Sequence, residues 1–223
     1  MVYLGFEISA EGIGPNPAKI SAITKMKIPQ NKSDVKTFLG ICGYYRMSID
    51  HYSDKAEVLS RLTHDDVFFK WGEEELNAFE LLKNCLINAP VLAYPDFTQP
   101  FILQTDASGV GISGILCQRI DGKEKVILYL SRTLTSGERK WHTRELEALA
   151  IMWSCETLRP YLIGEHFIVE TDHQSLEWLM KATTLARLVR WTLRLSEFSF
   201  TIKYRSGAKN KNADALSRLP ETV

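Results

Sequence analysis

Residues 101–114 constrain the fold of this chain more than any other stretch, because an apolar run, an acid and three glycines follow one another there. The apolar run ends at Asp106, and glycines at positions 109, 111 and 114 lead into a second apolar run over 115–120. Apolar runs of this length bounded by turn residues are typical of buried strands. We therefore expect two consecutive strands, with Asp106 at the end of the first.

The sequence that follows predicts that these strands belong to a larger sheet. A turn at Asp121-Gly122 predicts a third strand, over 125–131, antiparallel to the second. A helical pattern over 141–158 returns to a strand over 166–171, and such a crossover places the new strand parallel to the first and beside it. The C-terminal end adds expected helices over 176–180, 185–198 and 213–218, and a strand over 200–204. The expected fold is α/β (α+β), a mixed five-stranded sheet flanked by helices.

Residues 1–98 predict a separate, smaller and mainly helical domain. Residues 1–9 alternate partly between apolar and polar, as a strand does. Three helices are expected after them: one over 16–26, one that begins at a predicted N-cap, Ser33, and one over 76–86. Prolines at 90, 95 and 100 cannot lie inside a helix and predict an extended connector. A chain of 223 residues with 45% hydrophobic content can bury one or two ordinary cores. We therefore expect two domains, 1–98 and 99–220.

Four carboxylates on four expected elements are the candidate functional residues: Asp106, Glu147, Asp172 and Asp214. Asp106 and Asp172 each end a strand, and the C-terminal ends of adjacent parallel strands meet at the edge of a sheet where ligands bind. A single acid after a strand is usually only solvated, so the hypothesis depends on the whole set. Hard carboxylate oxygens are the ligands that Mg²⁺ prefers, and we expect the four acids to converge on a divalent-metal site.

Glu145 competes with Glu147 for the helical position in this site. The two residues lie about 200° apart around a helix, so only one of them can face the sheet. The apolar residues of this helix do not define a single inward face, and periodicity therefore leaves the choice open.

The charge of the chain is balanced overall but uneven along the sequence. The 27 basic and 27 acidic residues give no general indication of a nucleic-acid partner, yet residues 181–218 carry nine Lys or Arg side chains against two acidic ones. A basic strip beside metal-binding acids is where a phosphate backbone would bind; a solvated basic helix is the alternative. Arg187, Arg190 and Lys209 are the expected phosphate contacts.

The cysteines and the absence of long apolar runs predict the cellular compartment of the protein. The four cysteines form no CxxC pair and fall mostly in apolar runs, which predicts buried free thiols in a reducing compartment. The N-terminus has no basic start followed by an apolar segment, and no run of about 18 apolar residues occurs. We expect a soluble intracellular protein, cytoplasmic or nuclear.

Six stretches of the sequence carry a resemblance to one known family. They read FLGICGYYR (38–46), APVLAYPDF (89–97), TDAS (105–108), RELEALA (144–150), TDHQSLEWL (171–179) and GAKNKNADALSRLP (207–220). The last four resemble, in order, the ribonuclease H domain of gypsy-type LTR-retrotransposon polyproteins. The first two are similar to the thumb and connecting region of the same family's reverse transcriptase, and residues 1–9 are similar to the last hairpin of its palm.

The resemblance implies a ribonuclease H that hydrolyses the RNA strand of RNA/DNA hybrids by a two-metal mechanism with Mg²⁺ or Mn²⁺. In the implied site Asp106 bridges both ions, Glu147 and Asp172 complete one, and Asp214 completes the other. The family's motif favours Glu147 over Glu145.

The resemblance also implies partners and further contacts. Ser108 and Gln174 are the implied contacts to the RNA/DNA hybrid, and the upstream polymerase domains of the polyprotein are the second implied partner. The YxDD motif of the polymerase palm is absent from the sequence, so we expect no DNA synthesis by this chain alone. No histidine follows His173, so the loop before the last acid lacks the histidine that many cellular ribonucleases H carry there.

Two other functions compete with this interpretation. A catalytically silent, connection-type module that binds nucleic acid or serves a structural role, including one domesticated by a host, would be expected to have lost an acid, and none is missing. An integrase-type transferase would be expected to have Glu as its last acid and a His/Cys zinc module before the domain, and neither occurs.

Overall fold

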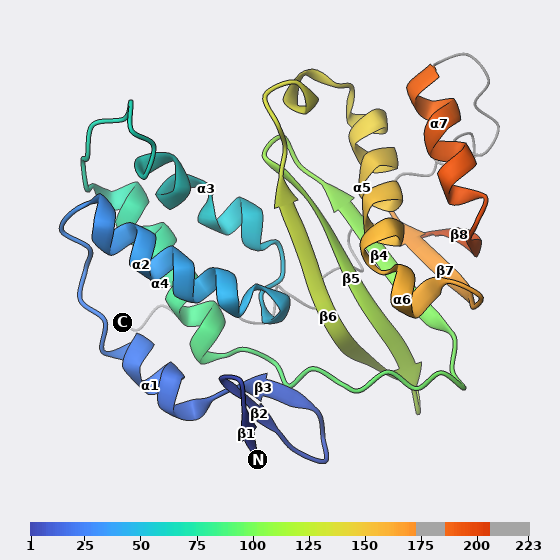
Figure 1. The fold of residues 1–223 in the computed structure, drawn as a ribbon, viewed down its shortest axis with the longest axis horizontal. Helices are drawn as coiled ribbons and strands as arrows, with labels where there is room; N and C mark the ends of the chain where they lie inside the picture. The colour runs from blue at the N-terminus through green and yellow to red at the C-terminus, as the bar shows by residue number, and fades with distance from the viewer. Residues whose placement is uncertain (173–185, 206–223) are drawn as a thin grey trace, which may run out of the picture.

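The computed structural model of the protein describes residues 1–172 and 186–205. Within them a group of N-terminal helices lies beside a five-stranded sheet that carries helices of its own (Figure 1). We call these parts the helical region, residues 1–87, and the sheet region, residues 101–205. Each is built on a separate hydrophobic core.

The helical region starts with a small antiparallel sheet and continues into helices. Its elements are β1 (Val2–Tyr3), β2 (Phe6–Ile8), β3 (Ile13–Pro15), α1 (Pro17–Thr24), α2 (Lys32–Tyr44), the 3-10 turn η1 (Arg46–Ser48), α3 (Tyr52–Leu62) and α4 (Glu73–Ile87). The sequence had predicted α1, α2 and α4 but no helix over α3. The predicted N-cap at Ser33 is wrong, because the Asn31 side chain accepts from the backbone N–H of Asp34 at 3.0 Å and α2 begins at Lys32.

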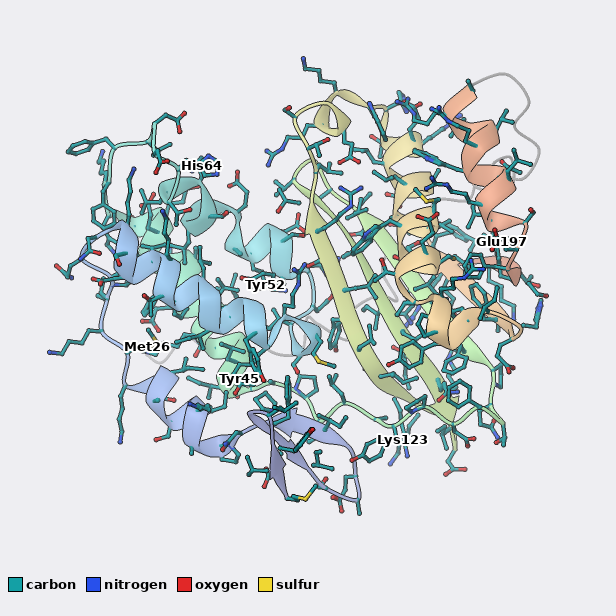
Figure 2. The ribbon with its side chains drawn as sticks, in the orientation of Figure 1. Met26, Tyr45, Tyr52, His64, Lys123 and Glu197 are labelled. Carbon is teal, nitrogen blue, oxygen red and sulfur yellow. The ribbon has the colours of Figure 1, made fainter. Side chains whose placement is uncertain are left out.

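Aromatic rings hold the helical region together. Phe38 of α2 and Phe79 of α4 are fully buried, with ring centroids 4.5 Å apart. At the end of α2 the hydroxyl of Tyr45 donates to the carbonyl of Gly5 at 2.8 Å, which joins the small sheet to the helices (Figure 2). Tyr45 thus serves the packing of the helical region, whereas Arg46 of the same YYR stretch donates to the carbonyl of Ser131 in the sheet region.

The sheet region contains the five expected strands, in the order β6-β5-β4-β7-β8. Its elements are β4 (Phe101–Ala107), β5 (Gly111–Ile120), β6 (Lys123–Thr133), the 3-10 turn η2 (Glu138–Lys140), α5 (Thr143–Thr157), α6 (Arg159–Leu162), β7 (His166–Thr171), α7 (Ala186–Leu195) and β8 (Ser199–Tyr204). Strands β4, β5 and β6 pair antiparallel, and β7 pairs parallel with β4 on one side and β8 on the other. The predicted crossover is confirmed. The helices expected over 176–180 and 213–218 lie outside the described residues.

The sheet is covered on both faces, by different parts of the chain. Leu130 of β6 belongs to the core that contains α5, whereas its neighbour Ser131 accepts, through its hydroxyl, a hydrogen bond from the backbone N–H of Ser53 in α3 at 3.1 Å. Because successive residues of a strand point to opposite faces, α5 and the helical region lie on opposite sides of the sheet (Figure 1). No helix in the described part of the chain is both long and apolar enough to cross a membrane.

Candidate metal-binding carboxylate site

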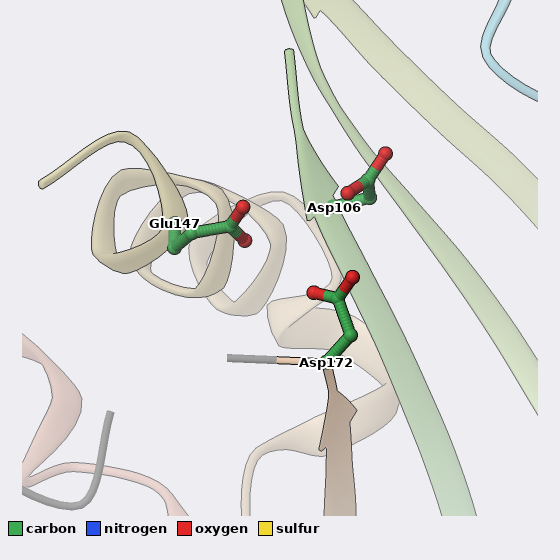
Figure 3. A group of neighbouring side chains, drawn as sticks. All are labelled: Asp106, Glu147 and Asp172. Carbon is green, nitrogen blue, oxygen red and sulfur yellow. The ribbon is translucent and has the colours of Figure 1, made fainter. Parts of the chain in front are cut away.

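Three of the four predicted acids meet at the end of the central strands. Asp106, Glu147 and Asp172 each offer a carboxylate oxygen, and these three oxygens lie within 4.8 Å of one another. They come from β4, from α5 and from the residue after β7, and their side chains point toward one another (Figure 3). We call this set the carboxylate cluster. Asp214, the fourth predicted acid, lies outside the described residues.

The pairing of β4 with β7 explains why two acids 66 positions apart become neighbours. Gln104 of β4 lies opposite Glu170 of β7 in a parallel register. Two residues further along, Asp106 lies near the end of β4 and Asp172 directly follows β7, so the two parallel strands deliver both acids to the same edge of the sheet. The sheet thus sets the spacing of these two carboxylates, whereas the third must come from a helix above them.

The structure resolves the choice between Glu145 and Glu147. Glu145 is the third residue of α5, and its carboxylate reaches back to the backbone N–H of His142 at the helix start, forming a capping box. It also forms an ion pair with Arg187. Glu147 is 2% exposed and faces the cluster. Glu145 therefore caps the start of α5, and Glu147 is the glutamate that belongs to the carboxylate cluster.

Burial and charge make Glu147 hard to ionise without a cation. Burial, reinforced by the charges of Asp106 and Asp172, raises the pKa of Glu147 to about 8. Another buried acid shows the contrast, because Glu170 is bonded to Arg119 at 2.9 Å and to Arg205 at 3.1 Å. Three carboxylates this close to one another, with the pKa of one of them raised by burial and by the other two, are characteristic of a functional site that binds a cation.

Sequence reasoning missed a histidine that reaches this cluster from the helical region. The Nε2 atom of His51 lies 3.0 Å from an oxygen of Asp106, and its Nδ1 atom lies 2.6 Å from an oxygen of Asp50. Burial lowers the pKa of His51, but the hydrogen bonds to Asp106 and Asp50 outweigh it and raise that pKa to about 10. No sequence signal marks this contact, because it joins residues 55 positions apart from two different regions.

The other predicted contact residues have structural partners where they are described. The hydroxyl of Ser108 bonds to the carboxylate of Asp54 in α3 and accepts from the backbone N–H of Gly111 at 2.9 Å. The guanidinium of Arg187 pairs with Glu145 and stacks 3.8 Å above the Trp141 ring. Arg190 is exposed on α7. Two predicted contacts, Gln174 and Lys209, together with His173, lie outside the described residues.

The donor set fits a divalent cation of the Mg²⁺ or Mn²⁺ type. All three groups are carboxylates, which these hard ions prefer over nitrogen or sulfur ligands. The four cysteines are free, and three of them are buried, as the sequence predicted; burial raises the pKa of Cys42 and Cys155 to about 12. Thiolate chemistry therefore has no part in this site.

The topology and the acids define the class of the sheet region. A family model described as "RNase H-like domain found in reverse transcriptase" matches residues 96–198. The fold is accordingly RNase H-like, with a helical region before it.

Curated relatives extend this match over nearly the whole chain. The retrovirus-related Pol polyprotein from transposon 297 of Drosophila melanogaster is 39% identical over 219 residues, which are 97% of this chain and 20% of that protein. The polyprotein from transposon 412 of the same organism is 37% identical over 98% of this chain. The transposon Tf2-3 polyprotein of Schizosaccharomyces pombe is 35% identical over 97%. The chain belongs to the LTR-retrotransposon Pol polyproteins of gypsy type, and it spans about a fifth of the length of these relatives.

Solved structures share the fold at lower sequence identity. A foamy viral protease-reverse transcriptase in complex with an RNA/DNA hybrid aligns with a TM-score of 0.75 and 23% identity, covering 100% of this chain and 31% of that one. The same viral protein in complex with double-stranded DNA aligns with a TM-score of 0.74 and 21% identity, covering 46% of its chain. Both alignments include the helical region as well as the sheet region.

Proposed function

We propose that this chain is the ribonuclease H part of a retrotransposon reverse transcriptase and that it hydrolyses the RNA strand of RNA/DNA hybrids. The observation that carries the proposal is the carboxylate cluster, in which β4, helix α5 and the residue after β7 each supply one acid. Burial beside two aspartates raises the pKa of Glu147 to about 8, and a divalent cation bound between the three carboxylates would favour their ionised forms.

Asp106, Glu147 and Asp172 would hold the divalent cations, with Asp214 as the proposed fourth ligand. Bound cations would lower the pKa of the attacking water and offset the charge of the leaving oxygen. The protein's own part is to fix the carboxylates: the β4–β7 register sets the two aspartates, and α5 brings Glu147 over them. Burial of Glu147 also keeps bulk water from its carboxylate, so charge interactions there are stronger than at the surface.

The substrate would be recognised by its charge and by the 2′-hydroxyls of its RNA strand. Exposed Arg190 of α7, together with Lys209, would contact backbone phosphates. Arg187 would mainly hold α7 against the start of α5, because its guanidinium already pairs with Glu145 and stacks on Trp141. An RNA/DNA hybrid differs from duplex DNA by 2′-hydroxyls in a shallow minor groove, and Ser108 and Gln174 remain our proposed contacts to it.

The test is cleavage of an RNA/DNA hybrid labelled on the RNA strand, with Mg²⁺ or Mn²⁺, by the purified chain. Asp106→Asn keeps the size of the side chain and removes its charge, and we expect it to lower the cleavage rate at least 100-fold. This exceeds the loss typical of groups that only support a metal ligand. Asp121→Asn is the matched control, because Asp121 lies in the exposed β5–β6 turn at φ 53°, a conformation that Asn also adopts.

Two results would contradict the proposal. RNA cleavage that survives Asp106→Asn would remove the cluster from the reaction. Tight hybrid binding by the wild-type chain without any cleavage would instead favour the silent, connection-type module.

A further inference from the structure

Helix α3 of the helical region begins at the edge of the carboxylate cluster. His51 is the residue before α3, and it adopts the left-handed conformation at φ 49°. This conformation is uncommon for residues other than glycine, although His is among those enriched in it. Such a backbone persists only where its surroundings fix it, so the contacts around His51 must hold it in place.

Several contacts on both sides of His51 hold α3 against the sheet. The backbone N–H of Ser53 donates to the hydroxyl of Ser131 in β6 at 3.1 Å, and Arg46 donates to the carbonyl of the same serine. Asp54 accepts from the hydroxyl of Ser108, in the loop after β4. We call this set of contacts between the helical region and the sheet region the joint. It reaches from the loop after β4 to β6, and together these contacts fix the position of His51.

Asp50 fixes the imidazole of His51 so that its second nitrogen faces the cluster. Nδ1 lies 2.6 Å from the Asp50 carboxylate, and this leaves Nε2 directed at oxygen Oδ2 of Asp106, 3.0 Å away. Asp106 is the acid that, in the proposed two-cation site, would use both carboxylate oxygens. One of these oxygens already accepts a hydrogen bond from another region of the chain.

We propose that His51 is a built-in competitor for one of the two cation positions, so that docking of α3 and full loading of the cluster oppose each other. The inference rests on the proposed function of the cluster and adds a regulatory contact to it. With α3 docked, the imidazole occupies the coordination position on Asp106 Oδ2. Binding of a second cation there moves His51 away, and the helical region thereby controls the loading of the site.

The coupling works in both directions. If docking weakens cation binding by some factor, cation binding must weaken docking by the same factor, because the two equilibria share one free-energy cycle. Couplings between sites usually amount to roughly 5–150-fold in affinity, so removal of the imidazole should strengthen cation binding by about tenfold.

The first measurement is Mn²⁺ affinity of the full chain, followed by electron paramagnetic resonance of the free ion. His51→Gly removes the imidazole while glycine accepts the left-handed backbone without strain, and we expect about tenfold tighter binding. His64→Gly is the matched control, since His64 is exposed in the same region and lies away from the sheet (Figure 2); its affinity should equal that of the wild type.

The second measurement is made on the wild-type chain by NMR. Mg²⁺ added to the wild-type chain should shift the NMR signals of the His51 ring, which the His51→Gly spectrum assigns, and leave those of His64 in place. Unchanged His51 signals, or Mn²⁺ binding that His51→Gly leaves the same or weakens, would overturn the inference. Asp106→Asn separates the two proposals: if it leaves Mn²⁺ binding intact, the cluster itself is not the cation site; if it abolishes binding, only the role of His51 is under test.

Discussion

The helical region and the sheet region bury different kinds of side chain. The helical core is almost wholly apolar, and Ser53, one of the few buried polar residues outside the sheet region, lies where α3 meets the sheet. The sheet region buries Gln104, Glu147 and Glu170 among its apolar residues. The first region is therefore built for packing, whereas the second carries buried charges that packing does not require.

This difference teaches where to look for function in the chain. Burial of an apolar ring stabilises the fold, whereas burial of a carboxylate costs stability unless a charge or a hydrogen bond offsets it. Glu170 has that offset within the protein, from Arg119 and Arg205. Glu147 lies against Asp106 and Asp172, whose charges raise its pKa further, while a hydrogen bond with the Ala107 backbone lowers it only in part. In the proposed function a bound cation would favour the ionised form of Glu147.

The largest stability effect should come from the helical core. Phe79→Ala removes a fully buried ring that lies against Phe38, and we expect it to lower the free energy of unfolding by about 3–5 kcal/mol. Urea unfolding followed by circular dichroism measures the loss. Phe68→Ala is the control, because Phe68 is 90% exposed and its removal should change stability by less than about 0.5 kcal/mol.

Phe79→Ala also tests whether the two regions have separate tasks. At low temperature, where the variant stays folded, its Mn²⁺ affinity should fall no further than that of Phe68→Ala. A loss of cation binding in parallel with stability would mean that the helical core supports the cluster directly, and the contrast between the regions would not hold.

The next effect should come from the buried carboxylate, and it should depend on pH. The pKa of Glu147 is about 8 in the folded, cation-free protein, above its ordinary value of 4.5. The folded state therefore holds this proton more tightly than the unfolded state does. The contribution of protonated Glu147 to the free energy of unfolding is fully present below pH 4.5 and is lost as the pH rises toward 8. Glu147→Gln cannot ionise and should be more stable than wild type by roughly 2–4 kcal/mol at pH 8.

Thermal unfolding at several pH values, with a chelator present, measures this difference. His51 also loses stabilisation as the pH rises, from 6.5 toward its folded pKa of about 10, but it is present in both proteins and should largely cancel. Equal stability of the two proteins at pH 8 would show that Glu147 is not strained by its acidic neighbours. Mg²⁺ should stabilise the wild type more than Glu147→Gln.

The smallest effect should come from the joint between the regions. A Cβ at Gly111 of β5 would meet the side chain of Ser53 and the carbonyl oxygen of Arg132, so Gly111→Ala should cost about 1–3 kcal/mol. At Gly109 a Cβ would meet nothing within 4 Å, and Gly109→Ala is the matched control. Equal melting temperatures for the two variants would mean that α3 docks loosely on the sheet.

The sheet region could be predicted well because its signals are local. Apolar runs that end in turn residues gave β4, β5 and β6, and the helix between two strands required the parallel pairing of β4 with β7. Asp106 and Asp172 followed from that pairing. The helical region was predicted less completely: α3 was not expected, and the cap of α2 lies at Asn31 and not at Ser33.

Two features of the site lay beyond any local pattern. The choice between Glu145 and Glu147 depends on a capping box whose N-cap is His142. Histidine is not one of the residues that typically begin a capping box, as Ser and Thr are, so the sequence does not predict it. The contact of His51 with Asp106 depends on the docking of one region on another.

The sequence by itself determined the strands of the sheet region, the crossover, the order of the acids and the family, because hydrophobic period, turn residues and motifs act over short stretches of chain. Residues 1–9, predicted as one strand, form the two strands β1 and β2. Only the tertiary structure decided which glutamate joins the aspartates, how strongly burial raises its pKa, and that a histidine from the helical region bonds to Asp106. These depend on distances and on exclusion of water between segments far apart in sequence, and such quantities exist only once the chain has folded.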